Sequence, residues 1–380
     1  MRHFDHLPRH DLDRLFHRPP QPFTLADDLG RLSVALGATL YSPATRPALA
    51  ADLRALAGRG LTSSVICLED AIADDEVGAA EANVISQLAE LSPDDAPMVF
   101  LRIRRPEQIP RLLDGLGPAG AVVAGFVLPK FTADNGARYL DAVAKGAANA
   151  GRRLLAMPVL ESAPIIFAES RIPQLLAIRE LVRCHRDRVL AVRVGATDLA
   201  SVYGLRRSRG LTVYDVRVIA DVIADVVNVL TRDDELIVTG AVWEYFPPTE
   251  RIFKPQLRET PFQTDPELRA GLVARDLDGL VREIALDQAN GITGKAVIHP
   301  THVALVHALS VVTHEEYTDA LDVFDTAARG GASASSFGDK MNESKPHAAW
   351  ARRILRRAEI FGVAAEHVTY VDLLAVGLRR

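Results

Sequence analysis

The segments AVVAGFVLPK (121–130), NGARYLDAVAKGAANAGRR (135–153) and LLAMPVLES (154–162) decide the fold. The first and the third are continuous apolar, β-branched runs, as strands buried on both faces should be. The segment between them has apolar residues at three- and four-residue spacing, which predicts an amphipathic helix. A strand, a helix and a strand in this order predict a parallel pair joined by a right-handed crossover.

The same unit recurs along the chain. Further apolar runs predict strands at ATLYSP (38–43), SSVICLED (63–70), MVFLRIR (98–104), VLAVRVGATD (189–198), ELIVTGAVWEY (235–245) and GKAVIHP (294–300). Eight such units over about 265 residues match the size of a (β/α)8 barrel. We therefore expect an α/β fold, a TIM barrel. The alternative is a doubly wound open sheet, but this would need a glycine-rich turn after the first strand, and the sequence has none there.

The expected domain organisation has three parts. Residues 1–35 are rich in His, Arg and Pro and predict an N-terminal arm. Residues 36–325 are predicted to form the catalytic barrel. Residues 326–380 begin with a small, polar stretch that predicts a mobile loop, and a C-terminal helical extension follows it.

Composition excludes several classes of protein. The formal net charge of −5 argues against a nucleic-acid binder held by a broad basic field. No run of about 18 apolar residues is present, which argues against a membrane span. Only two cysteines occur in 380 residues, so we expect a cytoplasmic protein without a disulfide framework.

Ionisable residues stand at the ends of the predicted strands. Because the loops at the carboxyl ends of barrel strands converge on one mouth, these residues should lie close together. In chain order they are Glu69, Asp70, Arg102, Arg104, Lys130, Glu161, Asp198, Glu244 and His299.

Carboxylates dominate this set. Acids crowded at one mouth repel one another, which raises their pKa values or requires a cation. Oxygen ligands without a nearby cysteine favour Mg²⁺, which one or two carboxylates usually hold together with water and substrate. Glu161 and Asp198 are the predicted ligands, with Glu69 and Asp70 reaching the metal through water.

Two residues keep two interpretations each. Lys130 is predicted either to contact the substrate or to form an ion pair across the rim. His299 is predicted either to take part in the chemistry or to cap the eighth strand by bonding a backbone group. The base that accepts the substrate proton also stays open, with Glu69, Asp70, a metal-bound water or a group from a neighbouring subunit as candidates.

The ordered motifs resemble a known family. ATLYSPATRP, VICLEDAI, FLRI, GFVLPK, MPVLESAPII, VGATDLAS and GKAVIHPTHV follow one another as in the HpcH/HpaI aldolase and citrate lyase β-subunit family. The N-terminal segment, VWEYF and GDKMNESKPHAAW resemble its stand-alone C–C bond lyase branch, which is associated with tellurium resistance.

The resemblance implies a Mg²⁺-dependent barrel lyase and a homo-oligomer, a trimer or a hexamer. It implies that Glu161 and Asp198 bind Mg²⁺ and that Arg102 holds a substrate carboxylate or carbonyl oxygen. It also implies that Glu69 and Asp70 bond the waters of the metal.

Two departures from the family pattern affect the predicted specificity. Arg104 stands where the family has Asn, and Cys67 stands where it usually has Asp. An extra cation at the mouth predicts a more anionic substrate. We therefore expect Arg102, Arg104, Lys130, Glu244 and His299 to contact the substrate.

The leading hypothesis is a Mg²⁺-dependent C–C lyase that acts through a metal-stabilised enolate. Its substrate would be a small carboxylated compound, with a CoA thioester or a phosphorylated compound as further options. One alternative is a thioester hydrolase or condensing enzyme on the same scaffold. Another is a metal-binding barrel that has lost catalysis.

Overall fold

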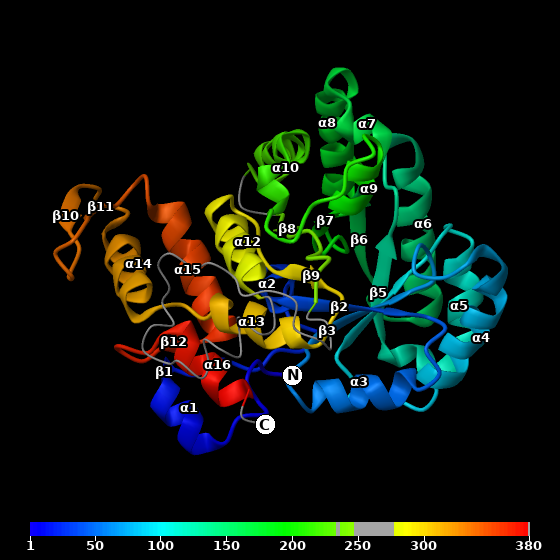
Figure 1. The fold of residues 1–380 in the computed structure, drawn as a ribbon, viewed down its shortest axis with the longest axis horizontal. Helices are drawn as coiled ribbons and strands as arrows, with labels where there is room; N and C mark the ends of the chain where they lie inside the picture. Colours follow the sequence, from blue (N-terminus) through cyan, green and yellow to red (C-terminus); the bar gives the residue numbers. More distant parts are fainter. Residues whose placement is uncertain (233–235, 247–276, 379–380) are drawn as a thin grey trace.

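The computed structural model describes residues 1–232, 236–246 and 277–378. Eight parallel strands form its centre (Figure 1). They are β2 (Ala38–Pro43), β3 (Ser63–Cys67), β4 (Met98–Arg102), β5 (Val123–Leu128), β6 (Leu155–Leu160), β7 (Val192–Val194), β8 (Val238–Thr239) and β9 (Lys295–Val297). Each lies within one of the predicted runs; residue 235, the expected start of the seventh run, lies outside the described residues.

The strands close into a barrel. Their order is β8-β7-β6-β5-β4-β3-β2-β9, so the last strand pairs with the first. Between β8 and β9, the Gly240 amide donates to the Gly294 carbonyl and the Ala296 amide donates to the Gly240 carbonyl, both at 3.1 Å. These bonds confirm the (β/α)8 barrel and exclude the open sheet.

Helices surround the barrel (Figure 1). Strand residues such as Leu101, Phe126 and Val192 point outward into the core shared with these helices, and the alternate residues point into the barrel. The surrounding helices are α3 (Leu49–Ala57), α4 (Val77–Leu88), α5 (Gln108–Leu116), α6 (Ala133–Ala150), α8 (Ala168–Cys184), α10 (Arg217–Leu230), α12 (Asp278–Ala289) and α13 (Thr301–Ser310).

The N-terminal segment, residues 1–35, contains two helices and a strand. It forms α1 (Arg9–Leu15), β1 (Phe16–Arg18) and α2 (Leu29–Ala35). Its apolar side chains are buried, and His3 is stacked on Phe361 with ring centroids 4.1 Å apart. The segment therefore packs both against the barrel and against the C-terminal extension.

The C-terminal extension begins before residue 326. Helix α14 (His314–Thr326) packs on α15 (Ala348–Phe361) in a small core of their own. The expected loop contains a hairpin of β10 (Ala332–Ala334) and β11 (Met341–Glu343), tied down because buried Asp319 accepts bonds from Ser335 and Asn342. Next, β12 (Val363–Ala364) pairs with β1, and α16 (Tyr370–Leu378) follows.

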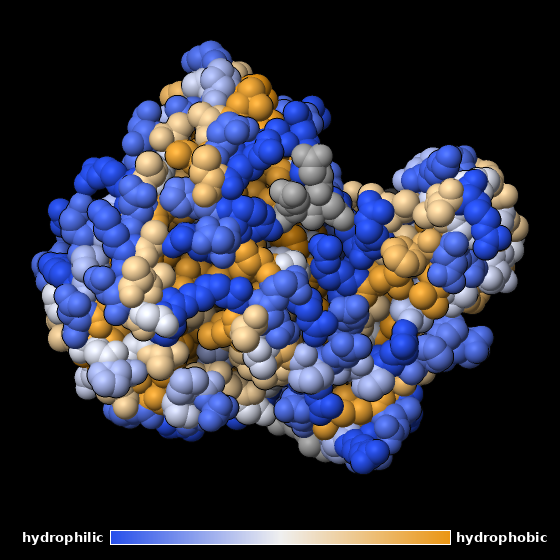
Figure 2. All heavy atoms as spheres, turned by 180° about the vertical axis from the view of Figure 1, so that it is seen from behind, coloured by the Kyte–Doolittle hydropathy of each residue, from blue (hydrophilic) through white to orange (hydrophobic). Residues whose placement is uncertain are grey.

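The surface is mixed in polarity. Hydrophilic side chains cover most of the face in Figure 2, where the C-terminal extension projects from the barrel as a lobe. Among the described residues, no helix combines the length and the apolarity that crossing a membrane requires.

Candidate active site

The mouth of the barrel gathers the predicted carboxylates around Arg102. This residue ends β4, and its Nη2 atom donates to Glu161 Oε1 at 3.0 Å and to Asp70 Oδ2 at 3.2 Å, and forms an ion pair with Glu69 Oε2 at 2.5 Å. The guanidinium is largely buried, and its Nε atom has no hydrogen-bond partner. Strands β3, β4 and β6 thus deliver one cation and three carboxylates to a single point.

Lys130 completes the rim after β5. Its ammonium group bonds Glu69 and reaches Asp70 at 3.2 Å, so the ion pair that was one of the two interpretations is present. Its backbone has a φ of 47°, in the left-handed region that is costly for a residue with a side chain. This conformation directs the Lys130 amide to Glu161 Oε1 at 2.9 Å, and Asn135 bonds the Lys130 carbonyl at 2.9 Å.

Glu161 and Asp198 form the other side of the mouth. Glu161 follows β6, and Asp198 lies in α9 (Ala196–Ser201), directly after β7. Glu161 is 3% exposed, and its Oε2 atom has no hydrogen-bond partner. A Cβ atom on Gly195 would collide with this carboxylate, so only glycine allows the close approach.

The four carboxylates differ in their proton affinity. Burial raises the pKa of Glu161 to about 7, against the attraction of Arg102, and the Asp198 charge adds to the rise. Burial likewise raises the pKa of Asp198 and of Glu69. Burial also acts to raise the pKa of Asp70, but bonding to Glu69 and the charges of Arg102 and Lys130 outweigh it and lower this pKa.

These features fit a divalent cation. A buried carboxylate oxygen without a donor, beside a second carboxylate of raised pKa, gains from a positive charge placed between them. No group of three or more His, Cys, Asp or Glu side chains within residues 1–232, 236–246 and 277–378 could hold a metal ion. Mg²⁺ does not need one, because water and substrate usually complete its shell.

Arg104 does not project into the mouth as a free cation. Its Nε atom donates to the Leu68 carbonyl at 2.8 Å, its Nη2 atom donates to the carbonyls of Glu69 and Ile72 at 3.1 and 2.9 Å, and its Nη1 atom pairs with Asp74. The expectation of an extra substrate-binding charge is therefore corrected. The guanidinium holds the loop that carries Glu69 and Asp70.

Glu244 and His299 lie at the β8 and β9 side of the mouth. Glu244 accepts a bond from Thr197 at 2.6 Å and lines a pocket of about 450 Å³ beside α9. His299 Nδ1 lies 2.7 Å from the Thr301 hydroxyl and 3.3 Å from the Thr301 amide, which is the predicted capping contact. Neither side chain bonds a member of the carboxylate cluster within the described part of the chain.

Tyr41, on β2, is a site residue that the sequence argument missed. Arg102, Cys67 and Glu161 lie near enough to act electrostatically on the Tyr41 hydroxyl, and Cys67 itself is buried. A tyrosine near the end of ATLYSP carries no charge, so it does not stand out among the charged residues at strand ends. The pattern that could have identified Tyr41 is a polar aromatic residue near the end of an otherwise apolar strand.

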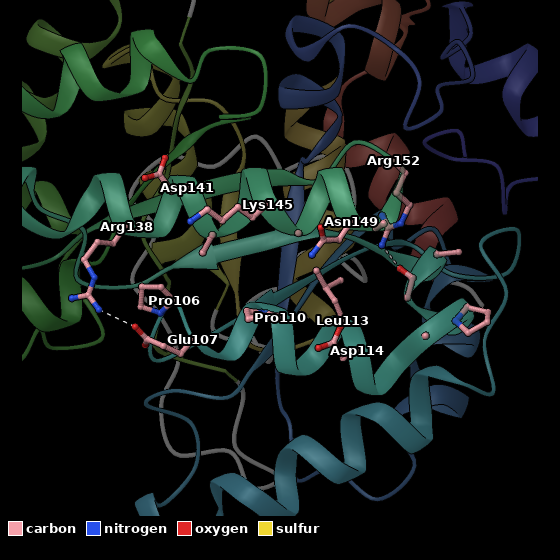
Figure 3. Close-up of a pocket in the computed structure, with 17 residues that line it drawn as sticks. Pro106, Glu107, Pro110, Leu113, Asp114, Arg138, Asp141, Lys145, Asn149 and Arg152 are labelled. Carbon is pink, nitrogen blue, oxygen red and sulfur yellow. Dashed lines mark hydrogen bonds and ion pairs between the residues drawn. The ribbon is translucent and has the colours of Figure 1, made fainter.

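A second hollow lies away from this chemistry. A groove of about 860 Å³ runs along the outer face of α5 and α6, lined by side chains such as Glu107, Arg138 and Lys145 (Figure 3). None of the mouth residues lines it. The carboxylate cluster, rather than this groove, is the candidate active site.

Comparison with protein families agrees with this geometry. The family described as C–C bond lyase of the TIM-barrel fold matches residues 30–363. The chain belongs to this family. The resemblance inferred from the ordered motifs is thereby confirmed, and the protein is an enzyme of the C–C lyase class. A search of curated proteins finds no match.

Solved structures share the fold of this C–C bond lyase at low sequence identity. CitE of Mycobacterium tuberculosis, in complex with magnesium, acetoacetate and coenzyme A, is 20% identical with a TM-score of 0.55, covering 86% of this chain and 99% of its own. A citrate lyase of Burkholderia xenovorans is 16% identical with a TM-score of 0.60, covering 89% and 96%. Malate synthase of Haloferax volcanii is 16% identical with a TM-score of 0.51, covering 71% and 72%.

Proposed function

We propose that this C–C bond lyase is Mg²⁺-dependent and cleaves or forms a bond next to a carbonyl group. The observation that carries the proposal is the buried Glu161 carboxylate, whose Oε2 atom lacks a donor, lies against Gly195 and is electrostatically coupled to Asp198. Glu161 and Asp198 would hold the metal. When bound, Mg²⁺ supplies Lewis-acid stabilisation to the oxygen on which negative charge develops.

Arg102 would orient the substrate. Its Nε atom is unpartnered, and its planar fork of donors suits a carboxylate or a carbonyl oxygen. The bonds from Nη2 to Glu69, Asp70 and Glu161 hold the guanidinium in place before the substrate arrives. Binding therefore requires little reorganisation of this side chain.

Glu69 and Asp70 would hold metal-bound water and accept the proton released by the cleaved hydroxyl. Of the two, Glu69 is the stronger base, because burial raises its pKa while the pKa of Asp70 is lowered. Lys130 and Arg104 would act by position, Lys130 on the carboxylates and Arg104 on their loop.

The substrate in this proposal is a small carboxylated compound or a CoA thioester. The proteins of similar fold support this, because their crystals contain magnesium with acetoacetate and coenzyme A in CitE, and glyoxylate in malate synthase. The mouth adds its own support, because Arg102 and Lys130 offer positive charge to an anion.

Thermal melting tests the metal assignment before the substrate is known. The wild type would be melted with and without Mg²⁺, and then with pyruvate, oxaloacetate, acetoacetate, glyoxylate, acetyl-CoA and phosphorylated sugars added in turn. A ligand at a hundred times its Kd stabilises the fold by about 2.7 kcal/mol. Glu161→Gln and Asp198→Asn should both lose the response to Mg²⁺; an unchanged response in either variant refutes the assignment.

Product analysis on the stabilising ligand tests the reaction. Cleavage yields two carbon fragments, whereas hydrolysis of a thioester yields free CoA. Metal binding without turnover of any of these compounds would refute the proposed substrate class.

A further inference from the structure

Arg193 is a charged residue inside the barrel. Its neighbours Val192 and Val194 face the outer core, and Arg193 is aligned with Val159 on β6 and Thr239 on β8, so its side chain points inward. It is 2% exposed. Within the described residues, no carboxylate lies within ion-pair distance of its guanidinium, and its Nη2 atom has no hydrogen-bond partner.

The contacts that Arg193 does make are weak. Its Nη1 atom lies 3.7 Å from the Met157 sulfur, and its Cζ atom lies 5.4 Å from the centre of the Tyr41 ring. A thioether is a poor acceptor, and a cation–π contact offsets only part of the cost of burying a charge. If position 193 had only a structural role, an apolar residue would stabilise the fold better than arginine does.

Tyr41 connects this buried charge with the mouth. Its ring covers the guanidinium of Arg193, and the residue is partly exposed. The hydroxyl forms no hydrogen bond to any described residue, although Arg102 and Glu161 act on it electrostatically. Burial raises the pKa of Tyr41, so the phenol remains a proton donor at neutral pH.

We propose that the Tyr41 hydroxyl donates a hydrogen bond to an anionic oxygen of the substrate held at the carboxylate cluster, and that Arg193 positions the Tyr41 ring and places a positive charge beneath it. The inference rests on the proposed function and adds to it a second binding element across the mouth from Glu161 and Asp198. Tyr41 is the residue that touches the substrate, and Arg193 acts through it.

Calorimetric titration of small anions into the Mg²⁺-saturated protein tests this element. The probes are oxalate, which has two anionic ends, and pyruvate, which has one carboxylate and a neutral carbonyl. Tyr41→Phe keeps the ring over Arg193 and removes only the hydroxyl. It should bind Mg²⁺ like the wild type and oxalate about tenfold more weakly or worse, the loss expected for one hydrogen bond to a charged group.

The two probes distinguish which oxygen of the anion accepts the hydrogen bond from Tyr41. If Tyr41 bonds the carboxylate that both probes share, oxalate and pyruvate should weaken by the same factor. If it bonds the oxygen that becomes negative in an enolate, oxalate should weaken more than pyruvate. Both results support the inference; unchanged affinity of Tyr41→Phe for both anions would overturn it.

Arg193→Met tests the positioning role. It replaces the guanidinium by an uncharged chain of similar length, a change that buried positions usually tolerate. It should weaken oxalate binding while Mg²⁺ binding is kept, and the double variant with Tyr41→Phe should be little weaker than either single variant, because the two residues act as a unit. Additive losses would contradict this coupling.

Tyr317→Phe is the matched control. Tyr317 lies in the C-terminal extension and bonds Arg18 of the N-terminal segment. Removing the Tyr317 hydroxyl should therefore leave anion affinity unchanged. The proposed function and this inference fail in different ways. A wild type that binds neither Mg²⁺ nor the anions refutes both, whereas a wild type that binds them with Tyr41→Phe unchanged refutes only the role of Tyr41.

Discussion

Replacing Glu161 with Gln tests the metal site through stability alone. In the metal-free protein, burial raises the pKa of Glu161 from 4.5 to about 7. The folded state therefore binds this proton more tightly than the unfolded state does. The resulting contribution to stability is fully present below pH 4.5 and is lost as the pH rises toward 7. At about 1.4 kcal/mol per pKa unit, the loss by pH 8 is about 3 kcal/mol.

Glutamine imitates the protonated carboxyl at every pH. Its side-chain oxygen can still accept from Arg102 and from the Lys130 amide, the two donors that Glu161 Oε1 uses. Without metal, Glu161→Gln should melt like the wild type at pH 5. At pH 8 it should melt roughly 4 °C higher, for a chain of this length. Saturating Mg²⁺ should stabilise the wild type at pH 8 and leave the variant unchanged.

Calorimetric melts at pH 5, 6, 7 and 8, with EDTA and with Mg²⁺, measure both effects. Glu180→Gln is the matched control, because Glu180 is an exposed side chain of α8. It should shift neither the pH profile nor the response to Mg²⁺. Parallel profiles for the wild type and Glu161→Gln would refute the burial argument. A full Mg²⁺ response in Glu161→Gln would refute the metal assignment.

Three further predictions follow from the same geometry. Mg²⁺ affinity should rise by up to about tenfold per pH unit below pH 7, with proton release, because Glu161 must ionise to bind; titration in buffers of different ionisation enthalpy measures this. Gly195→Ala should abolish the Mg²⁺ shift in the melting temperature by displacing Glu161, whereas Gly78→Ala, with open space around its Cβ, should keep it. Arg104→Gln should destabilise the protein by about 1–3 kcal/mol and lower kcat, yet keep the affinity for anions; a selective loss of anion affinity would restore its predicted role at the mouth.

The barrel was predictable because its signal is local. Continuous apolar runs alternate with amphipathic segments, and both patterns are visible within about 15 residues. Except for β2, the strands are shorter than the runs, as in β3, which ends at Cys67 where the run continues to Asp70. The remaining residues leave the ladder to form the mouth. The packing of the N-terminal segment was not predictable because its core contacts are non-local: Phe4, Phe16 and Phe23 stand among charged residues and prolines.

The candidate site was predictable to the extent that strand ends converge. Predicted strand ends identify Arg102 and the four carboxylates, but they also place Arg104 at the mouth, because the predicted run continues to residue 104. Strand β4 ends at Arg102, so Arg104 lies in the segment that follows the strand. Arg104 therefore faces the neighbouring loop. Arg193 was missed for the opposite reason, since it lies within a strand rather than at its end.

The charges at the mouth imply an order of binding. The groups that face one another are Glu69, Asp70, Glu161 and Asp198 against Arg102 and Lys130. If all are ionised, four carboxylates and two cations leave a net charge of −2, which disfavours an anion. One divalent cation neutralises this charge and also weakens the hold of the carboxylates on Arg102. Anionic substrates should therefore bind after the metal, and oxalate affinity measured with and without Mg²⁺ should differ far more than the affinity of an uncharged ligand.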